Sequence, residues 1–236
     1  MKTHLLAFGL AAATLVGLAT TASAGPITLV AGGSVSSGSI PSGPGGGTNE
    51  TLPLFGIAPT GFGFGYFGYE VDGTAGQYRV DVYGAEANFR NEFRLGSSTI
   101  YTHPGGTVIA GSLAAPLVST TFNHAGGLIN FSFAVNGGPI IVSNGSNPND
   151  KDPGAPQNFF ATFDPGIALA SQPLTGNGLY IFLDDGNQVD DNHDDLVVKI
   201  TALNPNPTPA PEPATLALFG VGLLGLGAAR RALRRT

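Results

Sequence analysis

The sequence predicts an all-β fold, an antiparallel β-sandwich or jelly-roll-like single domain. Short apolar segments recur from residue 77 to residue 202, with Gly, Pro, Asn and Asp between them. No segment between the two ends of the chain shows a long helical period. About 186 residues remain when the two ends are set aside, a length that fits one domain with its own core. Short alternating strands without helices are typical of sandwiches.

The clearest strand pattern begins at Gln77, where apolar and charged residues alternate. Tyr78, Val80 and Val82 fall on one face of this segment. Arg79 and Asp81 fall on the other, so we expect a strand with one solvated side. The same alternation recurs in 128–135. Further strands are predicted at 27–30, 107–113, 117–122, 139–142, 158–163, 179–183 and 196–202, whereas 87–95 fits either a strand or a short helix.

Two glycine-rich stretches lead to different predictions. Gly, Ser and Pro dominate 31–51, which therefore predicts a flexible loop. Residues 61–68, GFGFGYFG, alternate glycine with aromatic residues and formally contain a dinucleotide-binding fingerprint. That fingerprint requires a strand before it and a helix after it, and neither is predicted here. We expect packed sheet instead, with the rings covering neighbouring backbone.

The N-terminal segment has the composition of an export signal. Lys2 precedes an apolar run at 5–18, and Ala22-Ser23-Ala24 fits the small-x-small cleavage pattern. We therefore predict a signal peptide over 1–24 and a β-sandwich domain over 25–203. Residues 204–210 form a proline-rich linker, which we expect to be stiff and extended.

Charge and cysteine content exclude several classes of function. Between the two terminal signals the chain holds five basic and fifteen acidic residues, a formal charge of −10. This balance disfavours nucleic acid, whose phosphates need cationic contacts. The sequence has no cysteine, which excludes thiol catalysis and thiolate metal sites.

The C-terminal segment, 211–236, combines three parts. Pro211, Glu212 and Pro213 come first, and the uncharged run 214–229 follows. As a helix, its sixteen residues would rise about 24 Å, a little less than the roughly 30 Å hydrocarbon thickness of a membrane. The basic cluster that closes the chain consists of Arg230, Arg231, Arg234 and Arg235. Its charge would hold that end in the cytoplasm and leave the domain outside.

This order of parts resembles the PEP-CTERM sorting signal of Gram-negative bacteria. The resemblance implies recognition by a membrane exosortase, a transient stay in the inner membrane and removal of the tail near 211–213. It also implies association with exopolysaccharide at the cell surface or in the extracellular matrix. Signal peptidase would remove 1–24 during export. An ordinary membrane anchor behind a proline linker is the alternative for the tail.

The most chemically specific part of the domain is the acidic loop, 184–195, which joins two predicted strands. It holds six of the fifteen acids, and carboxylates this close need a cation or ample water to offset their repulsion. Oxygen ligands without thiolates favour Ca²⁺. The candidate ligands are Asp184, Asp185, Asp190, Asn192, Asp194 and Asp195.

Two observations bear on the Ca²⁺ prediction. Asp190, Asn192 and Asp194 match the start of an EF-hand loop, but Asp195 stands where that loop needs glycine and Thr201 where it needs glutamate. The order of strand, acidic loop and strand resembles a motif of exported bacterial β-domains, including DUF4114-type domains. In the alternative to a metal site, some acids accept backbone N–H groups of the turn and the rest are solvated.

A search for catalytic residues gives none. His103 and His124 each precede a glycine-rich turn, and His193 lies in the acidic loop, where carboxylates would favour its protonated form. No paired-ligand or nucleophile-elbow motif occurs. We therefore expect a non-enzymatic exported protein of the cell surface or biofilm matrix.

The alternative function is a secreted glycan-binding module or glycan-active enzyme with the same tail. Acid pairs such as Glu70 and Asp72 could serve glycoside hydrolysis. An exposed row of aromatic residues would support sugar binding. The candidates for that row are Phe62, Phe64, Tyr66, Phe67 and Tyr69.

Overall fold

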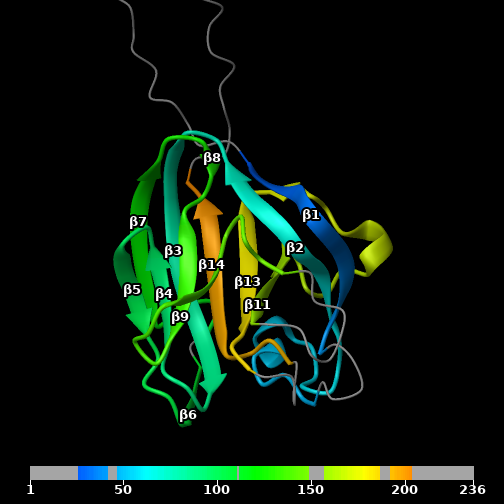
Figure 1. Ribbon diagram of the computed structural model, residues 1–236. Helices are drawn as coiled ribbons and strands as arrows, with labels where there is room; N and C mark the ends of the chain where they lie inside the picture. Colours follow the sequence, from blue (N-terminus) through cyan, green and yellow to red (C-terminus); the bar gives the residue numbers. More distant parts are fainter. Residues whose placement is uncertain (1–25, 42–46, 111, 149–156, 187–191, 204–236) are drawn as a thin grey trace, which may run out of the picture.

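The computed structural model describes residues 26–41, 47–110, 112–148, 157–186 and 192–203. Across these ranges the chain forms two packed antiparallel β-sheets and no α-helix (Figure 1), so the predicted all-β sandwich is confirmed. The predicted signal peptide, linker and sorting tail lie outside the described residues. No helix within the described ranges is long and apolar enough to cross a membrane.

The described residues contain a ten-stranded sheet, a four-stranded sheet and two short 3₁₀ helices. The large sheet comprises β1 (Ile27–Ile40), β2 (Gly63–Gly73), β3 (Gly76–Ala87), β6 (Thr107–Ala110), β7 (Val118–His124), β8 (Gly127–Leu128), β11 (Asn158–Thr162), β12 (Thr175–Gly176), β13 (Gly178–Asp184) and β14 (Leu196–Ala202). The small sheet comprises β4 (Asn91–Leu95), β5 (Ser98–Thr102), β9 (Phe131–Val135) and β10 (Ile140–Ser143). The 3₁₀ helices are η1 (Leu52–Phe55) and η2 (Leu169–Ser171).

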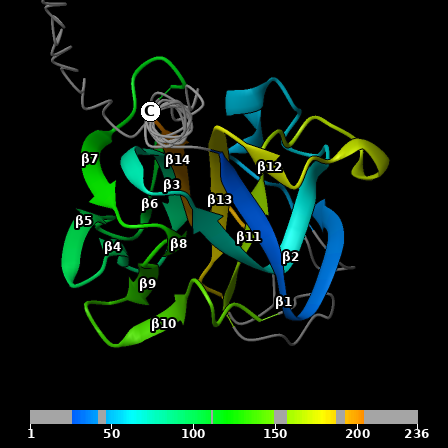
Figure 2. The same cartoon turned by 90° about the horizontal axis from the view of Figure 1, so that it is seen from above.

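The large sheet has the order β12-β1-β2-β11-β13-β14-β3-β6, with β8 paired to β2 and β7 paired to β3. The small sheet has the order β10-β9-β4-β5 and covers one face of the large sheet, as the view from above shows (Figure 2). Strands β13 and β14 lie at the centre of the large sheet, where Leu183 pairs with Leu196. The acidic loop therefore leaves the sheet at its middle.

The inner face of the large sheet packs against the small sheet and forms the main core. Tyr78, Val80 and Val82 are fully buried there, as their alternation predicts. The small sheet contributes Phe93, whose ring centroid lies 5.4 Å from that of Phe133. The prediction of a solvated opposite face in β3 is wrong for Asp81, which is 1% exposed. Asp81 is buried because Arg79 (2.8 Å) and Ser119 (2.6 Å) both donate to its carboxylate.

The outer face of the large sheet carries a second, smaller cluster. Leu54 and Phe55 of η1 pack over this cluster. Strand β13 is consequently buried on both faces, since Ile181 belongs to the main core and Phe182 to the outer cluster. The outer cluster consists of Ile40, Phe67, Tyr83, Phe160, Tyr180, Phe182 and Val197.

The predicted flexible loop at 31–51 is wrong for its first part, because β1 pairs with β2 as far as Ile40. Small residues are required there by close packing. A Cβ on Gly38 would lie 2.8 Å from the Phe67 ring, and a Cβ on Gly65 would lie 2.5 Å from the carbonyl oxygen of Ala161. The prediction of packed sheet within 61–68 is confirmed from Gly63 onward.

The remaining strand predictions differ from the structure mainly in length. The open choice at 87–95 resolves as the end of β3 and all of β4. Strand β5 was not predicted, because its segment lacks a run of apolar residues. The segment 128–135 divides into β8 and β9, and Ser132 and Ala134 are buried beside Phe131.

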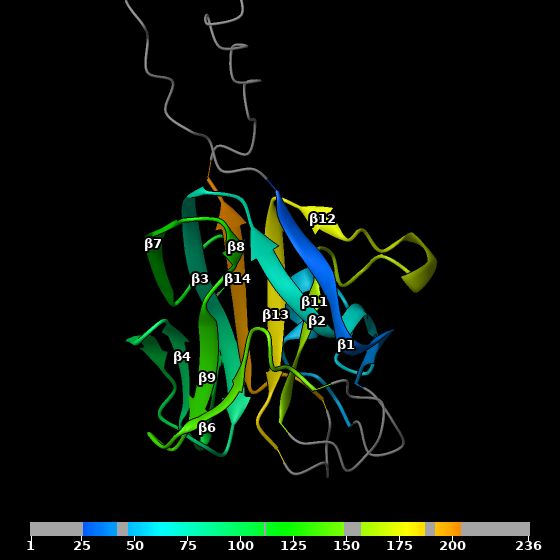
Figure 3. The ribbon, with the colours of Figure 1, turned by 45° about the horizontal axis from the view of Figure 1, so that its top comes forward.

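Both ends of the described domain lie at one end of the sandwich (Figure 3). Ile27 pairs with Gly73, and the backbone N–H of Leu203 donates to the carbonyl of Gln77 at 2.9 Å. Strand β13 runs away from this end and β14 returns to it. The acidic loop therefore lies at the opposite end of the sandwich from Leu203.

Candidate functional site

The structure gathers the described residues of the acidic loop at one end of β13 and β14. Asp184 ends β13, and Asp195 precedes β14. The backbone N–H of Asp185 donates to the Asp195 carboxylate at 2.8 Å, which joins the two sides of the loop. Asp190, the sixth predicted ligand, lies outside the described residues.

One side of the acidic loop is hydrogen-bonded to the segment before η1. The Asp194 carboxylate accepts the backbone N–H of Glu50 at 2.6 Å, and the Asn192 amide donates to the Thr48 carbonyl at 3.1 Å. In return, the Asn49 amide donates to the Asn192 carbonyl at 2.5 Å. We call these contacts between 48–50 and 192–194 the loop clamp.

The loop clamp positions η1. The side-chain oxygen of Asn49 accepts the backbone N–H groups of Thr51 and Leu52, each at 2.9 Å. These bonds fix the turn that leads into Leu52–Phe55. Asn192 acts through Asn49, and Asp194 acts through the backbone of Glu50, so both acidic-loop residues help to hold Phe55 on the outer face.

The carboxylates on the other side of the loop lie close to one another; Asp184 and Asp185 are buried and Asp195 is half-buried. Asp184 is 1% exposed; its Oδ1 accepts the Gly186 N–H at 2.8 Å, and its Oδ2 has no hydrogen-bond partner among the described residues. Burial, and then the charge of Asp185, raise the pKa of Asp195 to about 10, with smaller contributions from Asp184 and Asp194. Without a cation, burial and the neighbouring carboxylates therefore favour the protonated form of Asp195 at neutral pH.

The Ca²⁺ ligands predicted from the sequence are only partly free to bind. Within the described ranges, no group of three or more His, Asp or Glu side chains is arranged to hold a metal ion. Asp184 and Asp195 each accept a backbone N–H group of the loop, as the turn-capping alternative expects, whereas Asp194 accepts the N–H of the distant Glu50. The Ca²⁺ site stays a prediction, because part of its loop lies outside the described residues.

The three histidines occupy different environments. His124 Nε2 lies 3.0 Å from the Gly127 carbonyl in the turn before β8. His103 is fully buried after β5. His193 belongs to the acidic loop, but its buried ring points into the outer cluster, with Nε2 2.7 Å from Asn158 Oδ1 and the ring centroid 5.4 Å from Phe67.

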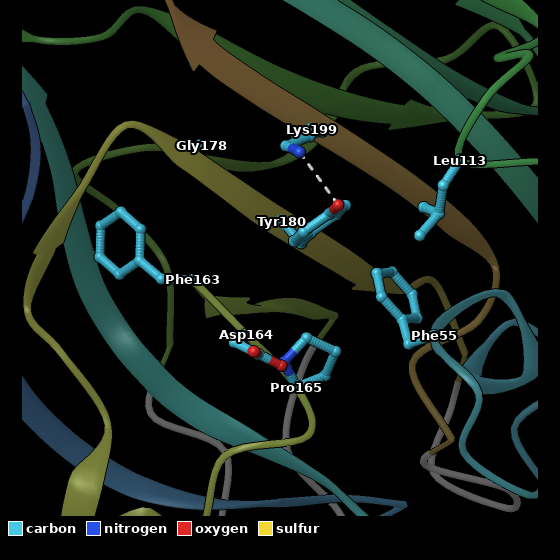
Figure 4. Close-up of a pocket in the computed structure, with 8 residues that line it drawn as sticks. All are labelled: Phe55, Leu113, Phe163, Asp164, Pro165, Gly178, Tyr180 and Lys199. Carbon is cyan, nitrogen blue, oxygen red and sulfur yellow. Dashed lines mark hydrogen bonds between the residues drawn. The ribbon is translucent and has the colours of Figure 1, made fainter. Parts of the chain in front are cut away.

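A pocket of about 360 Å³ opens on the outer face, and we call it the Lys199 pocket (Figure 4). Lys199 of β14 stands directly opposite Tyr180 of β13. Lys199 Nζ donates to the Tyr180 hydroxyl at 3.0 Å and lies 4.5 Å from the centre of the Tyr180 ring. The lining residues are Phe55, Leu113, Phe163, Asp164, Pro165, Gly178, Tyr180 and Lys199.

The walls of the Lys199 pocket are fixed by neighbouring contacts. The Phe55 ring meets Tyr180 edge to face at 4.8 Å. Opposite, the Asp164–Pro165 turn is held by the Phe64 N–H, which donates to the Pro165 carbonyl at 2.9 Å. The Gln172 amide donates to the Asp164 carbonyl at 2.9 Å. The pocket is therefore formed before any ligand binds.

The charge of Lys199 distinguishes it from the arginines of the described residues. Arg79 pairs with Asp81 at 2.8 Å, whereas Arg90 and Arg94 both pair with Glu92, at 3.3 and 2.7 Å. Lys199 is the one described basic residue without a carboxylate partner within ion-pair distance. Its ammonium group is available in the pocket.

Sequence reasoning did not find the Lys199 pocket. Lys199 lies between the apolar Val198 and Ile200, a signal only for an outward-facing strand residue. Its contact with Tyr180 depends on strand pairing, and that of Tyr180 with Phe55 depends on the loop clamp. The aromatic row considered for sugar binding is divided instead, since Tyr66 and Phe67 are buried while Phe62 is 57% exposed.

The predicted sorting residues, 211–213 and the four tail arginines, lie outside the described residues. Comparison with known protein families matches residues 209–235 to the PEP-CTERM protein-sorting motif. No curated protein matches the chain. The motif indicates a protein that an exosortase recognises during export and sorts to the cell surface, with transient membrane anchoring.

Proposed function

We propose that the protein acts as a non-enzymatic component of the cell surface or extracellular matrix and associates with exopolysaccharide. The sorting motif at 209–235 is the observation that carries this proposal. Signal peptidase would remove 1–24, and an exosortase would then cut the tail near Pro211–Pro213. The absence of recognisable catalytic motifs from the sequence supports a binding or structural role.

The positions of the two ends of the domain indicate which parts would face away from the membrane. Leu203, the last described residue before the sorting motif, lies at one end of the sandwich, and the acidic loop lies at the other. While the tail is held in the membrane, the acidic loop would therefore face away from it. The Lys199 pocket, on the outer face midway along β14, would be accessible from the side.

The test is the intact mass of the protein recovered from the culture supernatant of its native host. We expect a chain that has lost 1–24 at one end and the apolar tail at the other. In a strain without the exosortase, or in a Glu212→Ala variant, the tail should be retained and the protein should stay with the membrane fraction. A full-length chain folded in the cytosol would overturn the proposal.

We also propose that the acidic loop binds Ca²⁺ outside the cell. The buried Oδ2 of Asp184, which lacks a hydrogen-bond partner among the described residues, supports this proposal. A ligand at 100 times its Kd stabilises a folded protein by about 2.7 kcal/mol, so millimolar Ca²⁺ should raise the melting temperature. Asp184→Asn should reduce that rise, and Mg²⁺ serves as the control cation. Identical melting curves in EDTA and in Ca²⁺ would contradict the proposal.

A further inference from the structure

We propose that the Lys199 pocket binds a carboxylate-bearing sugar, the repeating unit of an acidic polysaccharide. The inference deepens the proposed association with exopolysaccharide and rests on that function for the source of the ligand. It places the contact with the polysaccharide at one pocket on the outer face and names one chemical class of ligand. The geometry of the pocket is independent of the sorting tail.

The first argument is charge. The domain is strongly acidic, and the three arginines of the described residues are neutralised by Asp81 and Glu92. Lys199 instead donates to the neutral hydroxyl of Tyr180. Asp81 stands opposite Lys199 on β3, but its carboxylate accepts from Arg79 and Ser119. An ammonium group beside apolar walls favours an anionic ligand group, because a charge-assisted hydrogen bond is stronger there than in open water.

The second argument is the aromatic lining. Phe55 and Phe163 stand on opposite sides of Tyr180 and Lys199 (Figure 4). Rings of this kind offer apolar faces for the C–H groups of a sugar ring. The volume of about 360 Å³ lies at the lower end of ligand pockets, which span roughly 300–1,000 Å³. One sugar unit with open ends fits this size better than a large ligand.

The third argument is the pairing of donor and acceptor groups. The carboxylate of Asp164, on an exposed turn of the pocket wall, can accept hydroxyl hydrogens, whereas Lys199 needs an acceptor. A uronic acid satisfies both, since it carries hydroxyl donors and a carboxylate on one ring. A fatty acid or an aromatic acid would offer Asp164 no hydroxyl donor beyond the Gly166 N–H that its carboxylate already accepts at 2.8 Å.

The fourth argument is the space left for the lysine. A Cβ on Gly178 would lie 2.7 Å from Lys199 Cε, so even an alanine would displace the lysine side chain. The backbone of Gly178 has no left-handed conformation that would itself require glycine. An alanine here would therefore move the end of the Lys199 side chain from the position that it occupies.

The test measures binding of D-glucuronate to the full-length chain by isothermal titration calorimetry. The chain is solubilised in a polyoxyethylene detergent, because sugar-headed detergents would compete. D-glucose tests the need for the carboxylate, and phenylacetate tests the need for the hydroxyl groups. Failure of sorting does not affect this measurement, so the two proposals can fail separately.

We expect saturable glucuronate binding, with glucose and phenylacetate each at least about tenfold weaker, given the usual strength of a hydrogen bond to a charged group. Lys199→Gln should weaken glucuronate binding roughly tenfold or more, and Lys199→Arg should retain most of it. Gly178→Ala should also weaken it while leaving the charge intact. Arg90→Gln removes an equal charge from the residue just before β4 and should leave affinity within about twofold.

Three outcomes would overturn the inference. The first is no saturable binding of glucuronate by the wild-type chain. The second is equal affinity for glucuronate and either comparison ligand. The third is unchanged affinity in both Lys199→Gln and Gly178→Ala, with each variant shown by its circular dichroism spectrum to be folded.

Discussion

The inner and outer faces of the large sheet are built from the same strands but differ in how they are covered. The inner face packs against a complete second sheet, and its cluster includes Phe93, Phe131 and Phe133. Within the described ranges, the outer face is covered by the short helix η1, held by the loop clamp, and by the ring of His193. The partial cover of the outer face leaves the Lys199 pocket at its margin. The full layer on the inner face leaves a smaller pocket of about 250 Å³, at its edge between Leu95 and Phe122.

This difference assigns separate roles to the two faces. Truncating a side chain on the inner face should lower stability and leave binding alone. A change at the margin of the outer cover should weaken binding and leave stability almost unchanged. The loop clamp lies between these cases, because it both buries polar groups and positions Phe55 against Tyr180. The predictions below test this division.

The largest effect is expected from Phe93→Ala on the inner face. Phe93 is fully buried between Phe131 and Phe133, so the change should lower the free energy of unfolding by about 3–5 kcal/mol. Urea unfolding measures this loss. Phe89→Ala, at a position that is 44% exposed, is the control and should cost less than about 0.5 kcal/mol. Similar losses in both variants would contradict the assignment of the core.

A smaller loss of stability is expected from Asn49→Ala in the loop clamp. The variant removes the acceptor for two backbone N–H groups and the donor to Asn192, which should cost about 2–3 kcal/mol. It should also weaken glucuronate binding, because Phe55 loses its support. Asn177→Ala, at an exposed asparagine, is the matched control. Unchanged stability in Asn49→Ala would show that the clamp does not hold η1.

The pH dependence provides a test of the acidic loop. The pKa of Asp195 is about 10 in the folded protein against an ordinary 3.8, so the folded state keeps a proton that the unfolded chain releases. The contribution of Asp195 to stability is full below about pH 4 and is lost as pH rises toward 10.

Asp195→Asn mimics the protonated side chain and should therefore stabilise the protein at pH 8 by at least about 1 kcal/mol. The difference between variant and wild type should disappear near pH 4. Chemical denaturation in EDTA at the two pH values measures it. If the stability difference between variant and wild type is the same at pH 4 and at pH 8, Asp195 does not hold a proton at pH 8.

The smallest stability change is expected from Lys199→Gln. Lys199 is half-buried and makes one hydrogen bond to Tyr180, so the free energy of unfolding should change by less than about 1 kcal/mol. The same variant should lose glucuronate affinity. A large loss of stability would mean that Lys199 supports the outer cluster instead of a ligand.

The sequence predicted the inner face well and the outer face poorly, for a physical reason. Alternation in Tyr78, Val80 and Val82 reports burial on one side of a strand, and that side faces the small sheet. It cannot show that the other side is also covered, which is why Asp81 was expected in solvent. Burial of that second side depends on partners distant in sequence, such as Ser119.

Two further features of the molecule, one in β1 and one in the acidic loop, could not be predicted because they depend on tertiary packing. Gly38 and its neighbours indicated a flexible loop, since composition does not reveal that the Phe67 ring occupies the space of a side chain. The acidic loop was correctly located between β13 and β14. Its use of Asp194 to hold the backbone of Glu50 requires two segments far apart in sequence to meet.

The most direct test of the division between the faces is to map glucuronate binding on the wild-type protein by ¹H–¹⁵N NMR. We predict shift changes at Phe55, Asp164, Tyr180 and Lys199, with none in β4 or β9. Shift changes concentrated on the small sheet, or none at saturating glucuronate, would contradict the account.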